Sequence, residues 1–292
     1  MQAGHFKYRL AFILLLIAGF AFAGGGWTQP KGGFYAKLDH WWTVYDQYYD
    51  LYGHKVEDRK RALLKTSIYG EYGVTPKLTV AGYFPFVSAA MVGEEVAKGS
   101  GQVLAEGDQL TTVGDGVLQV KYNLINALVA SLSVSGILGI PTGTAEGGTD
   151  GTLWTGDGEW NQMLRADLGI SIPVGDYYPY ANGYVGYNHR TRDFTDELHF
   201  GAEAGCELGK WFLVARMDRV RALKKGELEE ATFSNGLQLN NSSFWNLSAE
   251  VAYKFTELVG IVVGANQMVG GRQVYAGTGF SVGVFMAKSE WL

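Results

Sequence analysis

The sequence predicts an all-β protein: a transmembrane antiparallel up-and-down β-barrel of about twelve strands, within a range of ten to fourteen. Three observations predict it. Strand-like segments alternate apolar and polar residues in one phase along the chain, and the N-terminus has the pattern of an export signal. Aromatic residues and glycine are abundant, with 17 Tyr, 15 Phe, 8 Trp and 41 Gly, while only 47% of residues are hydrophobic. A membrane protein of ordinary hydropathy is expected to be a barrel, because only half of its strand residues face lipid.

The alternation is clearest in residues 160–172. Leu164 and Leu168 fall on one face of this segment, whereas Arg165 and Asp167 fall on the other. Successive side chains of a strand point to opposite faces, so the segment has one apolar wall and one charged wall. Repetition of this split along the whole chain indicates lipid outside the barrel and water inside.

A secreted β-sandwich or propeller is the competing structure. Such folds also alternate, but their outward face is polar and some of their core strands are wholly apolar. Here the apolar face is bracketed near the strand ends by aromatic residues, typical of the belts at the two membrane interfaces. These residues are Trp41, Trp42, Tyr72, Trp160, Tyr187, Trp211, Trp245 and Tyr253.

The N-terminus predicts a secretory signal. A basic start with Lys7 and Arg9 is followed by a short apolar run that ends in small residues at Ala23. The apolar run is well short of the roughly 20 residues that span a bilayer, which disfavours a membrane anchor. We therefore expect residues 1–23 to be a cleaved signal peptide and residues 24–292 to be a single barrel domain in the outer membrane of a Gram-negative bacterium.

Charge and cysteine content exclude several classes of function. The full chain has 24 basic and 29 acidic residues; without Lys7 and Arg9 it has 22 and 29, a net charge of −7. A net acidic chain argues against nucleic acid as a partner. The single cysteine, Cys206, cannot form an internal disulfide, and its apolar phase predicts a small buried or lipid-facing residue. No zinc or haem spacing is present, so neither a metal nor a cofactor is expected.

The expected strands follow one another as hairpins. In the first of them Leu38 and Trp42 oppose Lys37 and Asp39, and the later ones repeat this split. The expected strands span residues 33–44, 62–72, 78–87, 117–124, 128–140, 160–172, 178–188, 198–208, 211–220, 244–255, 258–268 and 279–287.

Short turns and long loops alternate between these strands. The short turns carry turn-forming residues such as Pro76, Asn126, Gly175 and Gly209. An even strand count with short turns at the periplasmic end and long loops outside is typical of outer-membrane barrels. The long loops are expected at residues 45–60, 88–112, 141–158 and 221–243, and the first three of these would form the mouth.

Charged residues of both signs share the inward phase of many strands. One interpretation is a packed network of ion pairs that fills a narrow lumen; the other is an open lining that selects solutes by charge. A barrel of about twelve strands is near the largest size whose interior side chains can fill, which slightly favours the packed network. The packed network and the open lining can also occur at different heights of the same lumen. The candidate lumen-lining residues are Lys37, Asp39, Lys65, Glu71, Lys121, Arg165, Asp167, Glu203, Arg216, Asp218, Glu250 and Lys254.

Four tyrosines cluster in the first expected outer loop: Tyr45, Tyr48, Tyr49 and Tyr52. They would form either an entry platform at the mouth for aromatic ligands or part of the interfacial belt. Face stacking is worth roughly 0.5–1.5 kcal/mol per aromatic pair, which makes the platform reasonable. The belt is the favoured interpretation.

Two motifs resemble parts of a catalytic site and of a calcium site, but neither is complete. Ser234-Asn235-Gly236 resembles part of the outer-membrane phospholipase signature, but no histidine accompanies it to take the serine proton, and His199 belongs to another hairpin. The cluster of Asp150, Asp157 and Glu159 has oxygen ligands suited to calcium but lacks the Asp-x-Asp-x-Asp-Gly order. Ordinary turns explain both motifs, so no catalytic residue is assigned and no enzyme is expected.

Several short segments together carry a resemblance to a known family. They are Trp27-Thr28-Gln29-Pro30-Lys31-Gly32, Val113-Gly114-Asp115-Gly116 with the following Lys121-Tyr122, Pro141-Thr142-Gly143, and Thr155-Gly156-Asp157-Gly158-Glu159. In these the chain resembles a transporter-like family of Gram-negative outer-membrane β-barrels related to the phenol-degradation-pathway (MetA-type) outer-membrane proteins. The resemblance implies uptake of small molecules, in particular hydrophobic or aromatic compounds.

The expected function is therefore a passive outer-membrane channel or uptake barrel for a small-molecule solute. A closed structural or adhesive barrel is the alternative, and an outer-membrane enzyme is a weaker one. Expected partners are outer-membrane lipid, lipopolysaccharide and the barrel-assembly machinery. The first strand is expected only about ten residues after the cleavage point. That spacing predicts no room for an N-terminal plug like that of long-chain fatty-acid channels.

Overall fold

The structure, a computed structural model, describes residues 25–175, 177–192, 194–223 and 241–288. The predicted signal peptide and Ser234-Asn235-Gly236 lie outside these ranges. Within them, no helix is long and apolar enough to cross a membrane. The barrel strands of the described chain are β1 (Phe34–Tyr49), β2 (Lys55–Thr75), β3 (Leu78–Val92), β7 (Gly116–Asn126), β8 (Ala130–Ile140), β9 (Asn161–Ser171), β10 (Tyr180–Arg190), β11 (Glu197–Leu208), β12 (Trp211–Ala222), β13 (Ser243–Lys254), β14 (Val259–Arg272) and β16 (Thr278–Lys288).

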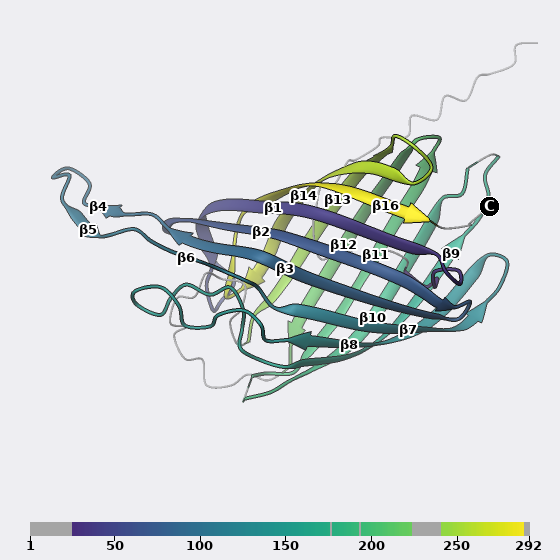
Figure 1. The fold of residues 1–292 in the computed structure, drawn as a ribbon. Coiled ribbons are helices and arrows are strands. Elements are labelled where there is room, and N and C mark those ends of the chain that lie inside the picture. Colours follow the sequence, from purple (N-terminus) through teal and green to yellow (C-terminus); the bar gives the residue numbers. More distant parts are fainter. Residues whose placement is uncertain (1–24, 176, 193, 224–240, 289–292) are drawn as a thin grey trace, which may run out of the picture.

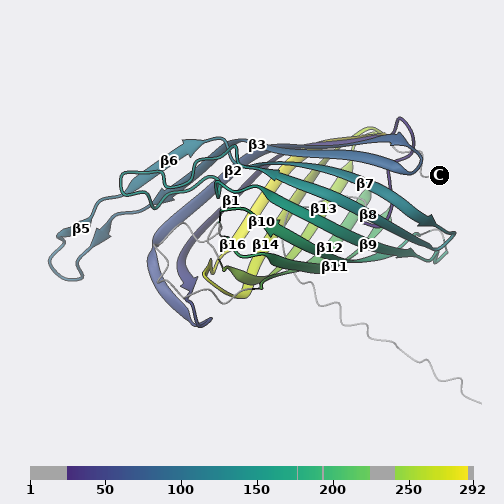
Figure 2. The ribbon, with the colours of Figure 1, turned by 90° about the horizontal axis from the view of Figure 1, so that it is seen from below.

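These twelve strands form one closed antiparallel barrel. Each strand pairs with its neighbours in the chain, and β1 pairs with β16 from Phe34↔Lys288 to Thr43↔Gly279, which closes the sheet. Figures 1 and 2 show the strands tilted around a common axis, with the C-terminal end of β16 beside the start of β1. The predicted fold class and strand count are confirmed. Below, the "short-turn end" is the end where β2 turns into β3, and the "loop end" is the opposite end.

Strands at the loop end are longer than the sequence predicts. β1 continues to Tyr49 and β2 begins at Lys55, so the predicted loop over 45–60 is wrong: only residues 50–54 connect these strands. The charged residues of 55–61 suggested a loop, but cross-strand pairing to β1, such as Gln47↔Glu57, keeps them in the sheet.

The predicted loop over 88–112 is also largely strand. β3 runs to Val92 and its end pairs with β6 (Asp108–Thr112), while β4 (Glu95–Val96) and β5 (Val103–Ala105) form a small hairpin beyond it. Figure 1 shows β4, β5 and β6 projecting well past the rest of the barrel. This side of the wall is therefore much taller than the side formed by β8 and β9.

The two faces of the barrel wall differ as the alternation predicts. On the outer face Leu164 and Leu168 are half or more exposed, whereas their neighbours Arg165 and Asp167 are buried inside. Aromatic rings occur near both ends of the outer face: Trp211 lies 4.7 Å from Tyr253 at the short-turn end. This apolar band is the surface that a β-barrel presents to lipid.

One residue of the predicted aromatic belt lies inside. Trp41 donates its indole N–H to Asn266 Oδ1 at 2.9 Å, within the barrel. Trp42 remains outside and packs near Phe280, at 6.1 Å between ring centroids. Adjacent strand residues face opposite sides, so Trp41 and Trp42 cannot both belong to the belt.

Candidate functional site

The lumen is the candidate functional site, and charged side chains cross it at mid-height. They come from β1, β9, β11, β12 and β13, where alternate positions face inward. We call this group the charged belt: Lys37, Asp39, Arg165, Asp167, Glu203, Arg216, Asp218 and Glu250.

One part of the belt is a chain of ion pairs. Arg216 binds Glu203 through Nε and lies with Nη1 at 3.1 Å from Glu250 Oε2. Glu250 Oε1 is 3.5 Å from Lys37 Nζ, which is also 3.5 Å from Asp39 Oδ1. The chain links β11, β12 and β13 to β1, so it spans the seam where the barrel closes.

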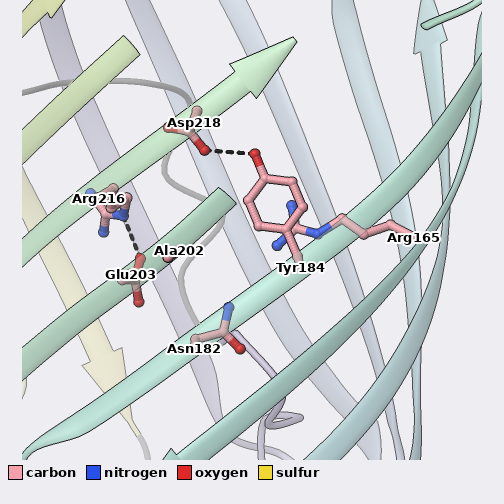
Figure 3. A pocket seen from close by; sticks show the side chains of 7 residues that line it. All are labelled: Arg165, Asn182, Tyr184, Ala202, Glu203, Arg216 and Asp218. Atoms are coloured by element: carbon pink, nitrogen blue, oxygen red, sulfur yellow. Dashed lines mark hydrogen bonds and ion pairs between the residues drawn. The ribbon is translucent and has the colours of Figure 1, made fainter. Parts of the chain in front are cut away.

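A second part of the belt is centred on Arg165. Its Nε lies 3.0 Å from each carboxylate oxygen of Asp167, and its guanidinium lies over the Tyr184 ring, 4.0 Å from the ring centroid. The Tyr184 hydroxyl donates to Asp218 Oδ1 at 2.6 Å. Figure 3 shows this pair beside the Arg216–Glu203 pair, so the two parts of the belt are neighbours.

A small cavity of about 40 Å³ lies between these pairs. That volume suits a few water molecules rather than a large solute. Asn182 contributes its amide to the wall, and its Oδ1 is buried without a hydrogen-bond partner among the described residues. The lining residues are Arg165, Asn182, Tyr184, Ala202, Glu203, Arg216 and Asp218.

The belt is packed rather than open. The side chains in its ion pairs are only 0% to 13% exposed. At this height the geometry corresponds to the packed network, not to an open charged lining. Lys254 differs: it pairs with Glu207 at 2.8 Å, with exposed fractions of 31% and 49%, near the short-turn end.

The remaining predicted charges lie outside these ion pairs, although Lys121 on β7 is in register with Arg165 through Ser135. Glu71 accepts hydrogen bonds from Tyr69 and, at 3.0 Å, from Gln29 Nε2. Lys121 is buried and donates to the carbonyl of Gly25 at 3.0 Å. Lys65 lies nearer the loop end, where the negative charge of Asp115 stabilises its ammonium group.

The bond from Lys121 reveals a feature that the sequence analysis did not predict. Residues 25–29, which we call the strap, lie inside the barrel before β1 begins. The Gly26 carbonyl accepts from Ser131 Oγ at 2.7 Å, Ser133 Oγ at 2.6 Å and Asn123 Nδ2 at 3.3 Å. The absence of a plug like that of long-chain fatty-acid channels stays a prediction, but the five residues of the strap, which reach roughly 17 Å when extended, do enter the barrel.

The barrel wall is shaped to receive the strap. A Cβ at Gly169 would lie 2.4 Å from the Trp27 ring, so the indole occupies the space that a side chain on β9 would fill. The Trp27 ring meets Tyr180 edge-on at 6.1 Å. The glycine run at 24–26 and the serines at alternate positions of β8 were the sequence signals for this slot.

Apolar side chains pack together inside the barrel towards the loop end. We call these residues the outer cluster: Tyr45, Leu63, Ala90, Val92, Leu153, Met268, Val274 and Tyr275. Leu153 comes from the loop between β8 and β9 and is completely buried. The rings of Tyr45 and Tyr275 are 4.9 Å apart.

The four tyrosines predicted in an outer loop are placed differently. Tyr45, Tyr48 and Tyr49 belong to β1. Tyr45 and Tyr48 are buried, Tyr49 packs against the outer cluster, and only Tyr52 is strongly exposed, at 74%. The interfacial belt was the favoured interpretation for these residues, and it is wrong for Tyr45 and Tyr48. β1 continues through both positions, and their side chains lie in the barrel interior.

Polar contacts hold the loop between β8 and β9 over the lumen. Asp115 accepts the backbone N–H groups of Gly143 at 2.9 Å and Asp157 at 2.8 Å. Asp108 on β6 accepts the N–H of Thr149 at 2.6 Å. The N–H groups of Thr149 and Gln109 stabilise the carboxylate and hold the pKa of Asp108 below its ordinary value.

The three acids considered for calcium are engaged elsewhere. Asp150 binds the Thr152 hydroxyl at 2.7 Å, Asp157 pairs with Arg190 at 3.0 Å, and Glu159 accepts from Thr191 at 2.6 Å. Within the described residues, no group of three or more His, Cys, Asp or Glu side chains is arranged to hold a metal ion. Cys206 is half-buried on the outward phase of β11.

The fold and its interior define a closed twelve-stranded barrel of the outer-membrane type with a filled lumen. The outer-membrane channel COG4313 from Pseudomonas putida F1 has a similar structure, with a TM-score of 0.62 and 16% identity over 92% of this chain and 100% of that one. The NanC and KdgM porins align more loosely, with TM-scores of 0.49 and 0.45, at 6% and 9% identity, over 87% and 86% of this chain and 99% of each porin. At these identities the likeness concerns the fold. No family profile and no curated protein sequence matches the chain.

Proposed function

We propose that the protein is a passive outer-membrane channel for small molecules in a Gram-negative bacterium. The charged belt carries this proposal. A barrel that served only as a membrane scaffold has no need of ionised groups inside, and buried ion pairs contribute little to stability compared with apolar packing. Charged side chains across a lumen are the usual means of selecting what passes.

The solutes we propose are small hydrophobic or aromatic compounds. Aromatic side chains pack on both sides of the charged belt: the Tyr45–Tyr275 pair towards the loop end, and Tyr35 stacked on Phe285 at 5.8 Å towards the short-turn end. Ring faces and edges of this kind favour aromatic guests.

A closed structural or adhesive barrel is the second candidate. The burial of the belt and of Leu153 in the outer cluster favours it. Permeation separates the two candidates, because a scaffold would pass neither ions nor solutes in any condition.

The experiment is single-channel recording of the refolded protein in a planar bilayer at neutral pH and high salt. It is paired with swelling of proteoliposomes in phenyl glucoside, an aromatic solute that the bilayer excludes, and in glucose, with protein-free liposomes as the control. A channel of the proposed class gives discrete conductance steps and admits phenyl glucoside faster than glucose, whereas protein-free liposomes admit neither. A folded, heat-modifiable barrel that is silent in both assays would overturn the channel and favour the scaffold; faster glucose entry would overturn only the solute class.

We also propose that the protein is not an enzyme and that lipid, lipopolysaccharide and the assembly machinery are its partners, with no role for nucleic acid. His199 supports the first point, because its Nε2 lies 2.7 Å from Glu197 Oε2 rather than against a nucleophile. Hydrolysis of a phospholipid or peptide by the purified barrel would contradict it.

A further inference from the structure

We propose that the strap is a reversible plug that closes the short-turn end of the lumen and leaves its slot when the channel opens. The purpose of such a plug rests on the proposed channel function, but its seating and release can be tested without permeation. The proposal depends on three features: a slot built for the strap, attachments by hydrogen bonds that water can replace, and a hinge.

The slot is matched to the strap residue by residue. Gly26 has no room for a side chain, since a Cβ there would lie 2.5 Å from both Gly169 N and Ser131 O. Asn123, Ser131 and Ser133 are all almost fully buried and direct their polar atoms at the Gly26 carbonyl. A wall that served only to line a pore would not need three donors converging on one carbonyl.

The strap also covers the interior. Lys121 reaches the Gly25 carbonyl, and a Cβ at Gly25 would lie 2.6 Å from the side chain of Asn182, which lines the cavity of the belt. The seated strap is therefore in contact with the inner edge of the belt. Its withdrawal would join the belt cavity to the space at the short-turn end.

The attachments are of a kind that can be exchanged for water. The contacts of Gly26 are hydrogen bonds from neutral side chains, each of which contributes modestly to stability. Two further bonds have a charged partner and hold the strap more tightly: Lys121 Nζ to the Gly25 carbonyl, and Gln29 Nε2 to the Glu71 carboxylate, each at 3.0 Å. Three donors also share a carbonyl oxygen that has two lone pairs. Water entering the lumen can replace such bonds at little enthalpic cost.

A hinge lies between the strap and β1. Gly32 has a φ of +78°, which favours glycine, and its N–H is bonded to the Gly73 carbonyl at 2.8 Å. Gly33 N in turn donates to the Pro30 carbonyl at 2.8 Å. The turn at 30–33 is thus pinned to the end of β2. Thr28 Oγ1 donates to the Pro76 carbonyl at 3.0 Å and Gln29 N donates to Thr79 Oγ1 at 2.8 Å, so release of the strap requires these two bonds to break and the chain to pivot at Gly32.

The test measures how fast a charged methanethiosulfonate reagent modifies a cysteine at the floor of the slot. Ser133→Cys is made in a Cys206→Ala background. It is then combined with deletion of residues 25–29 and, separately, with Gly169→Leu, which fills the Trp27 site. Gly136→Leu on β8 is the matched control, because a Cβ at Gly136 meets nothing within 4 Å.

We expect slow but complete modification in the full chain and in the Gly136→Leu control. Modification should be at least tenfold faster in the deletion and in Gly169→Leu. Equal rates in all four proteins would overturn the proposal, because the strap would not cover the slot. A full chain that stays unmodified while the deletion reacts would also overturn it, since the strap would then be a permanent part of the wall.

Conductance of the same proteins separates this proposal from the channel function. Higher conductance in the deletion and in Gly169→Leu than in the control supports both. If the modification rates follow the expected pattern but no variant conducts, the plug proposal is supported and the channel proposal is overturned. If Gly169→Leu does not fold, the deletion decides, because it leaves every barrel strand unchanged.

Discussion

Arg165 and Asp167 are two positions apart on β9 and form a forked ion pair inside the barrel, with Arg165 Nε 3.0 Å from each carboxylate oxygen. Asp167 has no exposed surface, and Arg165 is the counter-charge that lies directly against its carboxylate. The pair is therefore a sensitive point both for the stability of the barrel and for the charge in its lumen.

Loss of Arg165 alone should destabilise the barrel strongly. Arg165→Met leaves the Asp167 carboxylate buried without its partner, and breaking a buried pair in this way costs about 3–5 kcal/mol. Urea unfolding of the protein in detergent, followed by tryptophan fluorescence, measures the change. The double variant Arg165→Met/Asp167→Leu is the control, since replacing both partners with apolar residues should restore most of the lost stability. Equal losses in the single and double variants would show that the pair itself is not the cause.

Lys121 should influence ion selectivity. Lys121→Gln removes one positive charge from the lumen but keeps an N–H donor for the Gly25 carbonyl, so the strap can remain seated. The reversal potential in a salt gradient should shift towards cations. Lys77→Gln is the matched control, because Lys77 lies in an exposed turn outside the lumen. An unchanged reversal potential in Lys121→Gln would contradict an ion path past this residue.

Leu153 should determine whether the loop end stays closed. Leu153→Ala leaves a cavity in the outer cluster at a cost of about 2–5 kcal/mol, and the loop between β8 and β9 should detach more often. Faster proteolysis of this loop and higher conductance are the expected results. Glu146→Gln, at an exposed position of the same loop, should change neither. Conductance that stays at the level of the unaltered protein would show that Leu153 is not part of the barrier.

The tether between Asp108 and the same loop should weaken in acid. The pKa of Asp108 is held below its ordinary value of 3.8 in the folded protein, so the carboxylate form favours the closed loop. That stabilisation is fully present above the ordinary pKa and is lost as the pH falls through the lower, folded value. Hydrogen-exchange protection of the Thr149 amide should therefore fall below about pH 4. Asp108→Asn should show reduced protection already at pH 7 and no further loss in acid.

A charged residue on the outer face should destabilise the barrel most at the membrane midplane. Leu168→Arg near the middle of β9 should destabilise the barrel in lipid by about 2–4 kcal/mol, whereas Leu208→Arg at the short-turn end should cost about 0–1 kcal/mol. Unfolding in phospholipid vesicles measures both. Similar costs at the two positions would show that the apolar band does not face the bilayer.

Alternation alone located all twelve strands, but it failed at strand ends and for contacts between distant residues. The charged segment from Lys55 to Arg61 has no apolar alternation, yet its pairing to β1 makes it strand. Trp41 was assigned to the outer belt, although its neighbour Trp42 occupies that face. Local pattern describes one strand at a time, and the ends of strands depend on the partner strand.

The sequence by itself determined the alternation, and with it the position of each strand, the lipid-facing and interior faces and the closed-barrel class. Those properties have a period of two residues, so they can be read within a single segment. Only the tertiary structure decided what fills the lumen. Lys37 meets Glu250 across 213 residues and Gly26 meets Ser133 across 107. The packed belt, the buried Leu153 and the seated strap arise because strand register and barrel closure bring such distant side chains to the same height.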